Sequence, residues 1–180
     1  MGSNRALGRS FDPVPELPSS RGRCLAANWG VLTLRHLLVP IDFTETSERA
    51  LGYAVELARK FEASITVMHA YQIPVYGFPD GAYITGADLA AQISNAAQQR
   101  LDGVLDAQKI SGIPMSGVLR DGVPWEEINT VAAESGADLI IIGTHGRRGL
   151  ARALLGSVAE NVIRTSTLPV LVIHGPRDSA

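Results

Sequence analysis

The sequence predicts an α/β fold in which a five-stranded parallel sheet lies between two helical layers, a Rossmann-like three-layer sandwich. Three observations support this fold class. Short apolar runs alternate with helix-length amphipathic segments in the order βαβαβαβαβ. Residues 139–142 are four consecutive aliphatic residues, which is typical of a strand buried on both faces. A glycine-rich segment then precedes a helix, as at the carboxyl ends of parallel strands that bind phosphate.

The first elements are a predicted strand over residues 36–41, a helix that begins after Thr44, and a strand over residues 64–70. Hydroxyl and carboxylate side chains from Thr44 onward can cap the helix and favour its first turn. His69 ends the second strand without another histidine at metal-binding spacing, so we assign no metal site to protein ligands. The helix has one apolar face, which consists of Ala50, Leu51, Ala54, Val55, Ala58 and Phe61.

The next segment, residues 71–86, is rich in proline, glycine and aromatic residues, and is predicted to be a lid, a binding loop or a plain surface loop. A long helix follows it and ends near Gly112. Its predicted apolar stripe consists of Leu89, Ile93, Ala97, Leu101, Val104 and Leu105.

After residue 112 the chain has four further predicted elements besides the run at 139–142, and one of them is the helix that follows the glycine-rich segment. A strand over residues 115–120 precedes a helix that begins at Pro124, a favourable residue in a first turn, and stops at Gly136. Trp125 is expected to lie in the core. An apolar strand over residues 170–173 follows Pro169 and ends the sheet.

The candidate ligand site is the glycine-rich segment after residue 142. Gly143 and Gly146 lack the Cβ atoms that would keep a ligand away from the main chain. Gly156 and Ser157 begin a helix, whose free N–H groups and dipole attract anions. The spacing fits neither a Walker A loop nor a GxGxxG fingerprint. A tight connection with an ordinary helix cap explains the same pattern equally well.

The glycine spacing also resembles the ATP-binding signature of the universal stress protein family. That signature is glycine, two residues, glycine, nine residues, glycine and a serine or threonine, and the matching residues are Gly143, Gly146, Gly156 and Ser157. Residues 39–44 and 122–128 resemble the same family. The resemblance implies the strand order 3-2-1-4-5, ATP as ligand with any Mg²⁺ or Mn²⁺ bound through its phosphates, and a homodimer joined through the last strand.

The resemblance further implies which residues contact the nucleotide. Adenine and ribose are expected to contact Pro40, Ile41, Asp42 and Ala70. The sugar and phosphates are expected to contact Ile142, Gly143, His145 and Gly146. The phosphates are also expected to bind main-chain N–H groups and one hydroxyl, from Gly156, Ser157 and Val158. On the residues alone, Asp42 is also a candidate helix cap. The nearby Arg147, Arg148 and Arg152 either add positive charge around the triphosphate or form a solvated face of the loop.

Composition limits the other function classes. The chain has 180 residues, of which 46% are hydrophobic, enough for one compact domain. Its net charge of −2 provides no basic surplus for nucleic acid or for an anionic membrane. A single cysteine, Cys24, agrees with a reducing cytoplasm, and no apolar run reaches the about 20 residues of a membrane span. We therefore expect a cytoplasmic protein that binds neither nucleic acid nor membrane.

Three parts of the chain are predicted. Residues 1–34 contain proline, serine and arginine without periodicity, so we expect a disordered extension, or residues upstream of a natural start near Val31 or Leu32. Residues 35–175 form the family domain, and residues 176–180 form a short tail.

No catalytic constellation accompanies the candidate site, because no cysteine lies near it and no second carboxylate opposes Asp42. The leading hypothesis is an ATP-binding universal stress protein that acts in stress response, with at most slow hydrolysis or autophosphorylation. A nucleotide-independent dimeric scaffold is the alternative. A nucleotide-activating enzyme of the adenine nucleotide α-hydrolase superfamily is less favoured, because residues 42–47 lack its SGGxDS-type loop.

Overall fold

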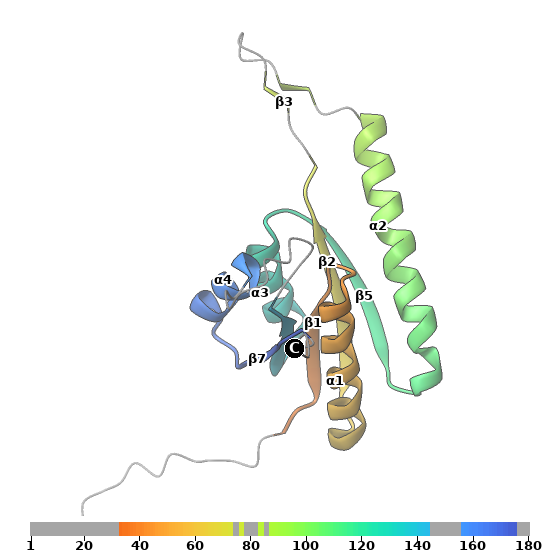
Figure 1. Cartoon of the computed structure of the whole chain (residues 1–180), viewed down its shortest axis with the longest axis vertical. Helices are drawn as coiled ribbons and strands as arrows, with labels where there is room; N and C mark the ends of the chain where they lie inside the picture. The colour runs from red at the N-terminus through yellow and green to blue at the C-terminus, as the bar shows by residue number, and fades with distance from the viewer. Residues whose placement is uncertain (1–32, 74–75, 78–82, 85–86, 145–155, 176–180) are drawn as a thin grey trace, which may run out of the picture. The chain divides into compact units, whose positions relative to one another are not determined.

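The computed structural model describes residues 33–73, 76–77, 83–84, 87–144 and 156–175 (Figure 1). Most of the predicted N-terminal extension, the tail and parts of the 71–86 segment lie outside the described residues. The same holds for five residues of the candidate site: His145, Gly146, Arg147, Arg148 and Arg152.

The described elements follow the predicted order. The strands of the main sheet are β1 (His36–Pro40), β2 (Ser64–Tyr71), β5 (Met115–Asp121), β6 (Leu139–Gly143) and β7 (Val170–Ile173). The helices are α1 (Glu45–Phe61), α2 (Ala87–Gln108), α3 (Pro124–Ser135) and α4 (Ser157–Thr165), with a 3-10 turn, η1 (Lys109–Ser111), after α2. Two short strands, β3 (Tyr76–Gly77) and β4 (Tyr83–Ile84), pair in antiparallel fashion within the segment predicted as a loop.

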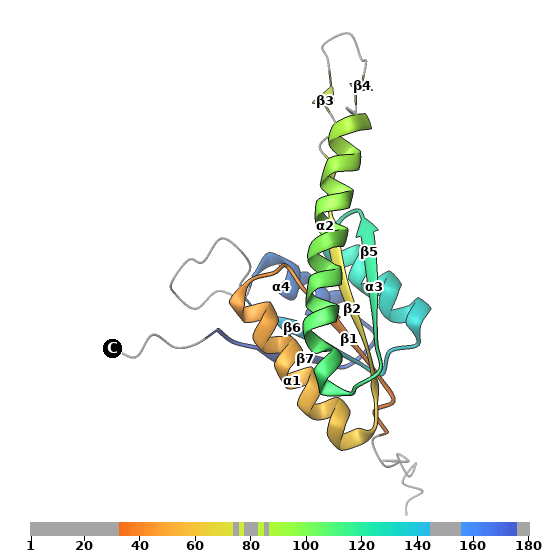
Figure 2. The same cartoon turned by 90° about the vertical axis from the view of Figure 1, so that its right-hand side faces the viewer.

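The main sheet is parallel throughout and has the strand order β5-β2-β1-β6-β7. Numbered along the chain, its strands run 3-2-1-4-5, so the predicted order is confirmed. Helices α1 and α2 cover one face of the sheet, and α3 and α4 cover the other (Figure 2). The direction of the crossovers therefore reverses between β1 and β6, which makes their carboxyl ends the topological switch point.

Local sequence signals set the ends of the helices. Thr44 is the N-cap of α1 and forms a reciprocal capping box with Ser47. Pro124 occupies the first turn of α3, as predicted, and Gly136 ends that helix in the left-handed conformation at φ 64°. The predicted end of the α2 segment at Gly112 is confirmed as well, since this residue caps η1 at φ 70°.

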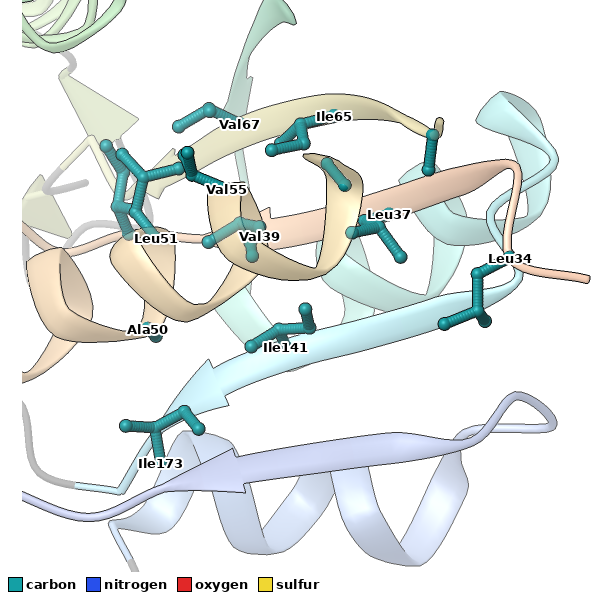
Figure 3. Packing of buried hydrophobic residues seen from close by; sticks show 14 of the residues in the cluster. Leu34, Leu37, Val39, Ala50, Leu51, Val55, Ile65, Val67, Ile141 and Ile173 are labelled. Carbon is teal, nitrogen blue, oxygen red and sulfur yellow. The ribbon is translucent and has the colours of Figure 1, made fainter. Parts of the chain in front are cut away.

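The first core cluster lies between α1 and the sheet (Figure 3). Alternate strand residues such as Val39, Val67 and Ile141 pack against the predicted apolar face of α1, because strand side chains alternate between the two faces of a sheet. Leu34 belongs to this cluster and is 6% exposed. The packed structure thus includes a residue just before the expected boundary at residue 35.

The second core cluster lies on the opposite face, beneath α3 and α4. It includes Leu38, Ile140 and Ile142 from the central strands, and Trp125 packs against it as a half-buried side chain. Among the described residues, no helix is long and apolar enough to cross a membrane.

Two residues of the predicted apolar faces are more exposed than expected. Phe61 is 38% exposed, because it is the last residue of α1, where the chain turns toward β2. Leu89 is 40% exposed in the first turn of α2. Figures 1 and 2 both show the first turns of α2 beyond the ends of the strands, so they have little sheet to pack against.

Asp138 joins the amino ends of the two central strands. Its Oδ2 accepts hydrogen bonds from the main-chain N–H groups of Arg35 at 2.7 Å and His36 at 3.0 Å. The Asp138 N–H in turn donates to the carbonyl of His36 at 2.8 Å. One carboxylate thereby aligns β1 with β6 at the end opposite the candidate site.

We expect the substitution Asp138→Ala to lower the free energy of unfolding by about 1–3 kcal/mol, because the exposed Arg35 N–H and the partly buried His36 N–H lose a charged acceptor. Asp138→Asn retains an acceptor oxygen and should lose clearly less. Urea unfolding near neutral pH measures both changes. Equal stability of the alanine variant and the wild type would contradict this role.

Candidate ligand site at the carboxyl edge of the sheet

The carboxyl ends of β1 and β6 lie side by side at the switch point. Leu38 pairs with Ile140 in the ladder, and the chain leaves β1 through Ile41 and Asp42 while β6 ends at Gly143. Ile41 N donates to the carbonyl of Met68 on β2 at 2.8 Å. The fold therefore brings several predicted site residues to one edge of the sheet, namely Pro40, Ile41, Asp42, Ala70, Ile142 and Gly143.

Asp42 orients the start of α1. Its Oδ1 accepts hydrogen bonds from the Thr44 N–H at 3.1 Å and from the Thr44 hydroxyl at 2.6 Å. The alternative interpretation of Asp42 as the helix cap is therefore wrong: Thr44 is the N-cap of α1, and Asp42 holds that residue in place. Within the described residues, Oδ2 of the half-buried Asp42 has no hydrogen-bond donor, so it is the oxygen that a ligand could use.

Gly143 is required by packing within the chain. A Cβ atom at this position would lie 3.0 Å from Thr46 Cγ2 and 3.1 Å from the Thr46 carbonyl oxygen, in the first turn of α1. Thr46 is 8% exposed and lies directly against the end of β6. The sequence prediction assigned this glycine to ligand approach, whereas the structure gives a reason for it that needs no ligand.

Thr144 closes the connection between β6 and α4. Its N–H donates to the carbonyl of Ile173 at 3.0 Å, and its own carbonyl accepts the N–H of Gly156 at 2.6 Å. The side chain is 1% exposed. Gly156 was predicted to donate its N–H to phosphate, but in the structure that N–H donates to Thr144 instead.

The first turn of α4 has no side-chain cap. Gly156 is its N-cap, and the first intrahelical bond runs from the Glu160 N–H to the Gly156 carbonyl at 2.9 Å. The N–H groups of Ser157, Val158 and Ala159 precede that bond, so they have no acceptor within the helix. Together with the helix dipole, they make this end of α4 a favourable position for an anion.

Two side-chain hydrogen bonds lie within α4, and a third joins it to α3. Asn161 Nδ2 donates to the Ser157 carbonyl at 2.9 Å, and the Thr165 hydroxyl donates to the Asn161 carbonyl at 2.7 Å. Asn129 on α3 donates its Nδ2 to Thr165 Oγ1 at 2.8 Å. These bonds, with the buried Ala159 and Val162, fix the direction in which the first turn of α4 points.

His69 is a packed residue, as predicted. Its Nδ1 lies 2.7 Å from the carbonyl oxygen of Ile41, and its ring contacts the ring of Phe43. No group of three potential metal ligands occurs among the described residues. Away from this edge, Lys109 donates a hydrogen bond to the carboxylate of Asp106, which raises the pKa of Lys109.

Fold and site together define a doubly wound α/β protein with an uncapped helix N-terminus next to its switch point. The model of the universal stress protein family matches residues 33–174 of the chain. A relative from Methanocaldococcus jannaschii, universal stress protein MJ0531, is 32% identical over 145 residues, which cover 79% of this chain and 84% of the relative. The chain belongs to the universal stress protein family.

Solved structures support the same assignment. The structure of MJ0577 aligns with a TM-score of 0.69 at 28% identity and covers 81% of this chain and 99% of that one. A universal stress protein solved in complex with cAMP aligns with a TM-score of 0.58 at 26% identity, covering 79% and 98% of the two chains. Universal stress protein YxiE of Bacillus subtilis is 29% identical over 77% of this chain and 97% of its own length.

Thr46 and Thr144 are structural residues of this edge that the sequence analysis did not single out. Both are buried polar side chains beside main-chain junctions. A threonine directly after the end of an apolar strand is a weak signal, since the same residue type is common in loops. Only the fold brings Thr46 to Gly143, which lies 97 residues later in the chain.

We expect Gly143→Ala to lower the free energy of unfolding by about 1–3 kcal/mol, because the added methyl group overlaps Thr46. Gly52→Ala is the matched control, since Gly52 lies within α1 and a Cβ there meets no atom within 4 Å. The control should gain about 0.5–1 kcal/mol from helix propensity. Urea unfolding of both variants tests the contrast, and equal effects of the same sign would contradict it.

Proposed function

We propose that this protein binds an adenine nucleotide, with ATP as the preferred ligand, at the carboxyl edge of its sheet and acts in stress response in the cytoplasm. The observation that carries the proposal is the uncapped first turn of α4 beside the switch point. Family membership and the relative solved with cAMP support it.

In the proposed complex, the phosphates bind at α4. The N–H groups of Ser157 and Val158 and the Ser157 hydroxyl offer donors to a polyanion, and the exposed position of Ser157 leaves them accessible. His145 and Gly146 stay predicted contacts on the same side. Any Mg²⁺ or Mn²⁺ is proposed to bind through the phosphates, since oxygen ligands suit these hard ions.

The base and sugar are proposed to lie over the ends of β1 and β2. Asp42 Oδ2 can accept a hydrogen bond from a ribose hydroxyl or the adenine amino group, while Ile41 and Ala70 provide apolar contact. Gly156 is not proposed to donate its N–H to the phosphates, because that N–H already donates to the Thr144 carbonyl. Its role in the site is to begin α4 as the N-cap residue. We propose at most slow hydrolysis or autophosphorylation by this arrangement.

A second candidate function is a nucleotide-independent scaffold. Two observations favour it. Asp42 accepts hydrogen bonds from Thr44, the N-cap of α1, and the absence of a Cβ on Gly143 leaves space for Thr46. Both residues thus have structural roles without a ligand. The two functions differ in whether substitutions at the start of α4 change an affinity for nucleotide.

We also propose a homodimer joined through β7. Among the described residues β7 pairs only with β6, so its other edge offers main-chain groups to another strand. Ile140 N donates to the Pro169 carbonyl and Thr144 N to the Ile173 carbonyl. Because hydrogen-bonding direction alternates along a parallel strand, Val170 and Val172 direct their N–H and C=O groups to the free edge.

Isothermal titration calorimetry with ATP tests the site at Ser157. Ser157→Pro removes one N–H and the hydroxyl at a first helical position, where proline is tolerated and Gly156 already has an extended conformation. We expect its affinity for ATP to fall about tenfold or more, because hydrogen bonds to a charged group are lost.

Ser157→Ala is the matched control, because it removes only the hydroxyl and should weaken binding less. Urea unfolding should give the same stability for both variants within about 1 kcal/mol. A wild-type protein that binds no ATP at millimolar concentration would overturn the nucleotide proposal. So would a proline variant that binds ATP as tightly as the wild type.

Sedimentation velocity tests the proposed dimer. Val172→Pro removes an N–H from the free edge of β7 and leaves the bonds to β6 in place, so we expect a shift from dimer to monomer. Val172→Thr keeps the main-chain donor and a branched side chain, and it should stay dimeric. A monomeric wild type, or a dimeric proline variant, would contradict a junction through β7.

A further inference from the structure

Phe43 has an unfavourable main-chain conformation beside the candidate site. Its φ is 62°, in the left-handed region that bulky residues rarely adopt. Asp42 precedes it and Thr44, the N-cap of α1, follows it. The two hydrogen bonds between Asp42 Oδ1 and Thr44 span this residue, so the conformation of Phe43 decides where the carboxylate of Asp42 points.

The Phe43 ring is held by two residues from other elements. The ring of His69, on β2, has its centroid 4.5 Å from that of Phe43 at an interplanar angle of 50°. The guanidinium carbon of Arg100, on α2, lies 4.2 Å from the ring centroid, within the range of a cation–π contact. His69 is itself fixed by the 2.7 Å contact of Nδ1 with the Ile41 carbonyl.

Arg100 is the part of this arrangement that the fold does not otherwise require. Its side chain is exposed, whereas its neighbour Leu101 is fully buried in the core. Among the described residues its guanidinium has no salt bridge with a carboxylate within 4 Å. Its contact with Phe43 is therefore the interaction that places this charge at the edge of the sheet.

We propose that Arg100 is a positioning residue for the nucleotide site. Its cation–π contact stabilises the left-handed conformation of Phe43 and thereby holds the Asp42 carboxylate in place for the base and sugar. The inference rests on the proposed nucleotide binding.

Three substitutions isolate the contact. Arg100→Met keeps an unbranched chain but removes the charge, Arg100→Lys restores a cation, and Arg59→Met is the matched control. Arg59 is also exposed, and it pairs with Glu56 in the last turn of α1, at the opposite end of that helix from Phe43. Urea unfolding should change the folding equilibrium of each variant by no more than the about two- to fivefold factor of one exposed contact, so all three stay folded.

The first measurement needs no nucleotide. Amide hydrogen exchange followed by NMR reports the Thr44 N–H, which is shared between Asp42 Oδ1 and Ser47 Oγ, each at 3.1 Å. We expect Arg100→Met to accelerate its exchange about two- to fivefold, the range set by an exposed cation–π contact, while Arg100→Lys stays near the wild type. Unchanged exchange in Arg100→Met would overturn the positioning role.

The second measurement compares ATP with inorganic tripolyphosphate, which has no base or sugar. Arg100→Met should weaken ATP binding about two- to fivefold and leave tripolyphosphate binding unchanged, because Asp42 faces only the base and sugar. Equal weakening of both ligands would make Arg100 a direct phosphate ligand and overturn the proposal. Wild-type protein that binds neither ligand would overturn the proposed function itself, and normal ATP binding by Arg100→Met would overturn only this inference.

Discussion

The close contact between the first turn of α1 and the end of β6 is the constraint on which the carboxyl edge depends. Gly143 has no Cβ, so Thr46 packs onto the main chain at a distance where a Cβ atom would force it back by a few tenths of an ångström. Thr46 Oγ1 also lies 3.2 Å from the position of a Cβ on Gly175, just after β7. Because α1 begins directly after β1, this contact sets the ends of β1, β6 and β7 relative to one another.

The two helices that start at this edge, α1 and α4, differ in how the N–H groups at their N-termini are satisfied. The Thr44 side chain accepts the Ser47 N–H in the first turn of α1, and Asp42 and Ser47 accept the Thr44 N–H, whereas no described side chain caps the first turn of α4. Thr144 engages the Gly156 N–H and so fixes the start of α4 without satisfying the N–H groups that follow. The same edge therefore offers an acceptor, on Asp42, and a set of donors, on α4.

Beside the candidate site, Phe43 adopts a main-chain conformation that its residue type disfavours. Phe43 has a positive φ, and in folded proteins such conformations persist only where surrounding contacts hold them. Here those contacts come from β2 through His69 and from α2 through Arg100. The other non-glycine residue with a positive φ in the described chain, Glu62 at φ 56°, is the C-cap of α1, a position where the left-handed conformation is common.

The sequence by itself determined the five strands of the main sheet and the four helices, but not the β3–β4 pair. Periodicity, the aliphatic run before Gly143, Pro124 and Gly136 act over a few residues, so they can be recognised without the fold. The strand order followed from family resemblance. Tertiary structure alone decided that Gly143 faces Thr46, that the Gly156 N–H donates to Thr144, and that Arg100 meets Phe43. These contacts join residues far apart in the chain, and a side chain's partner there depends on packing that no local pattern encodes.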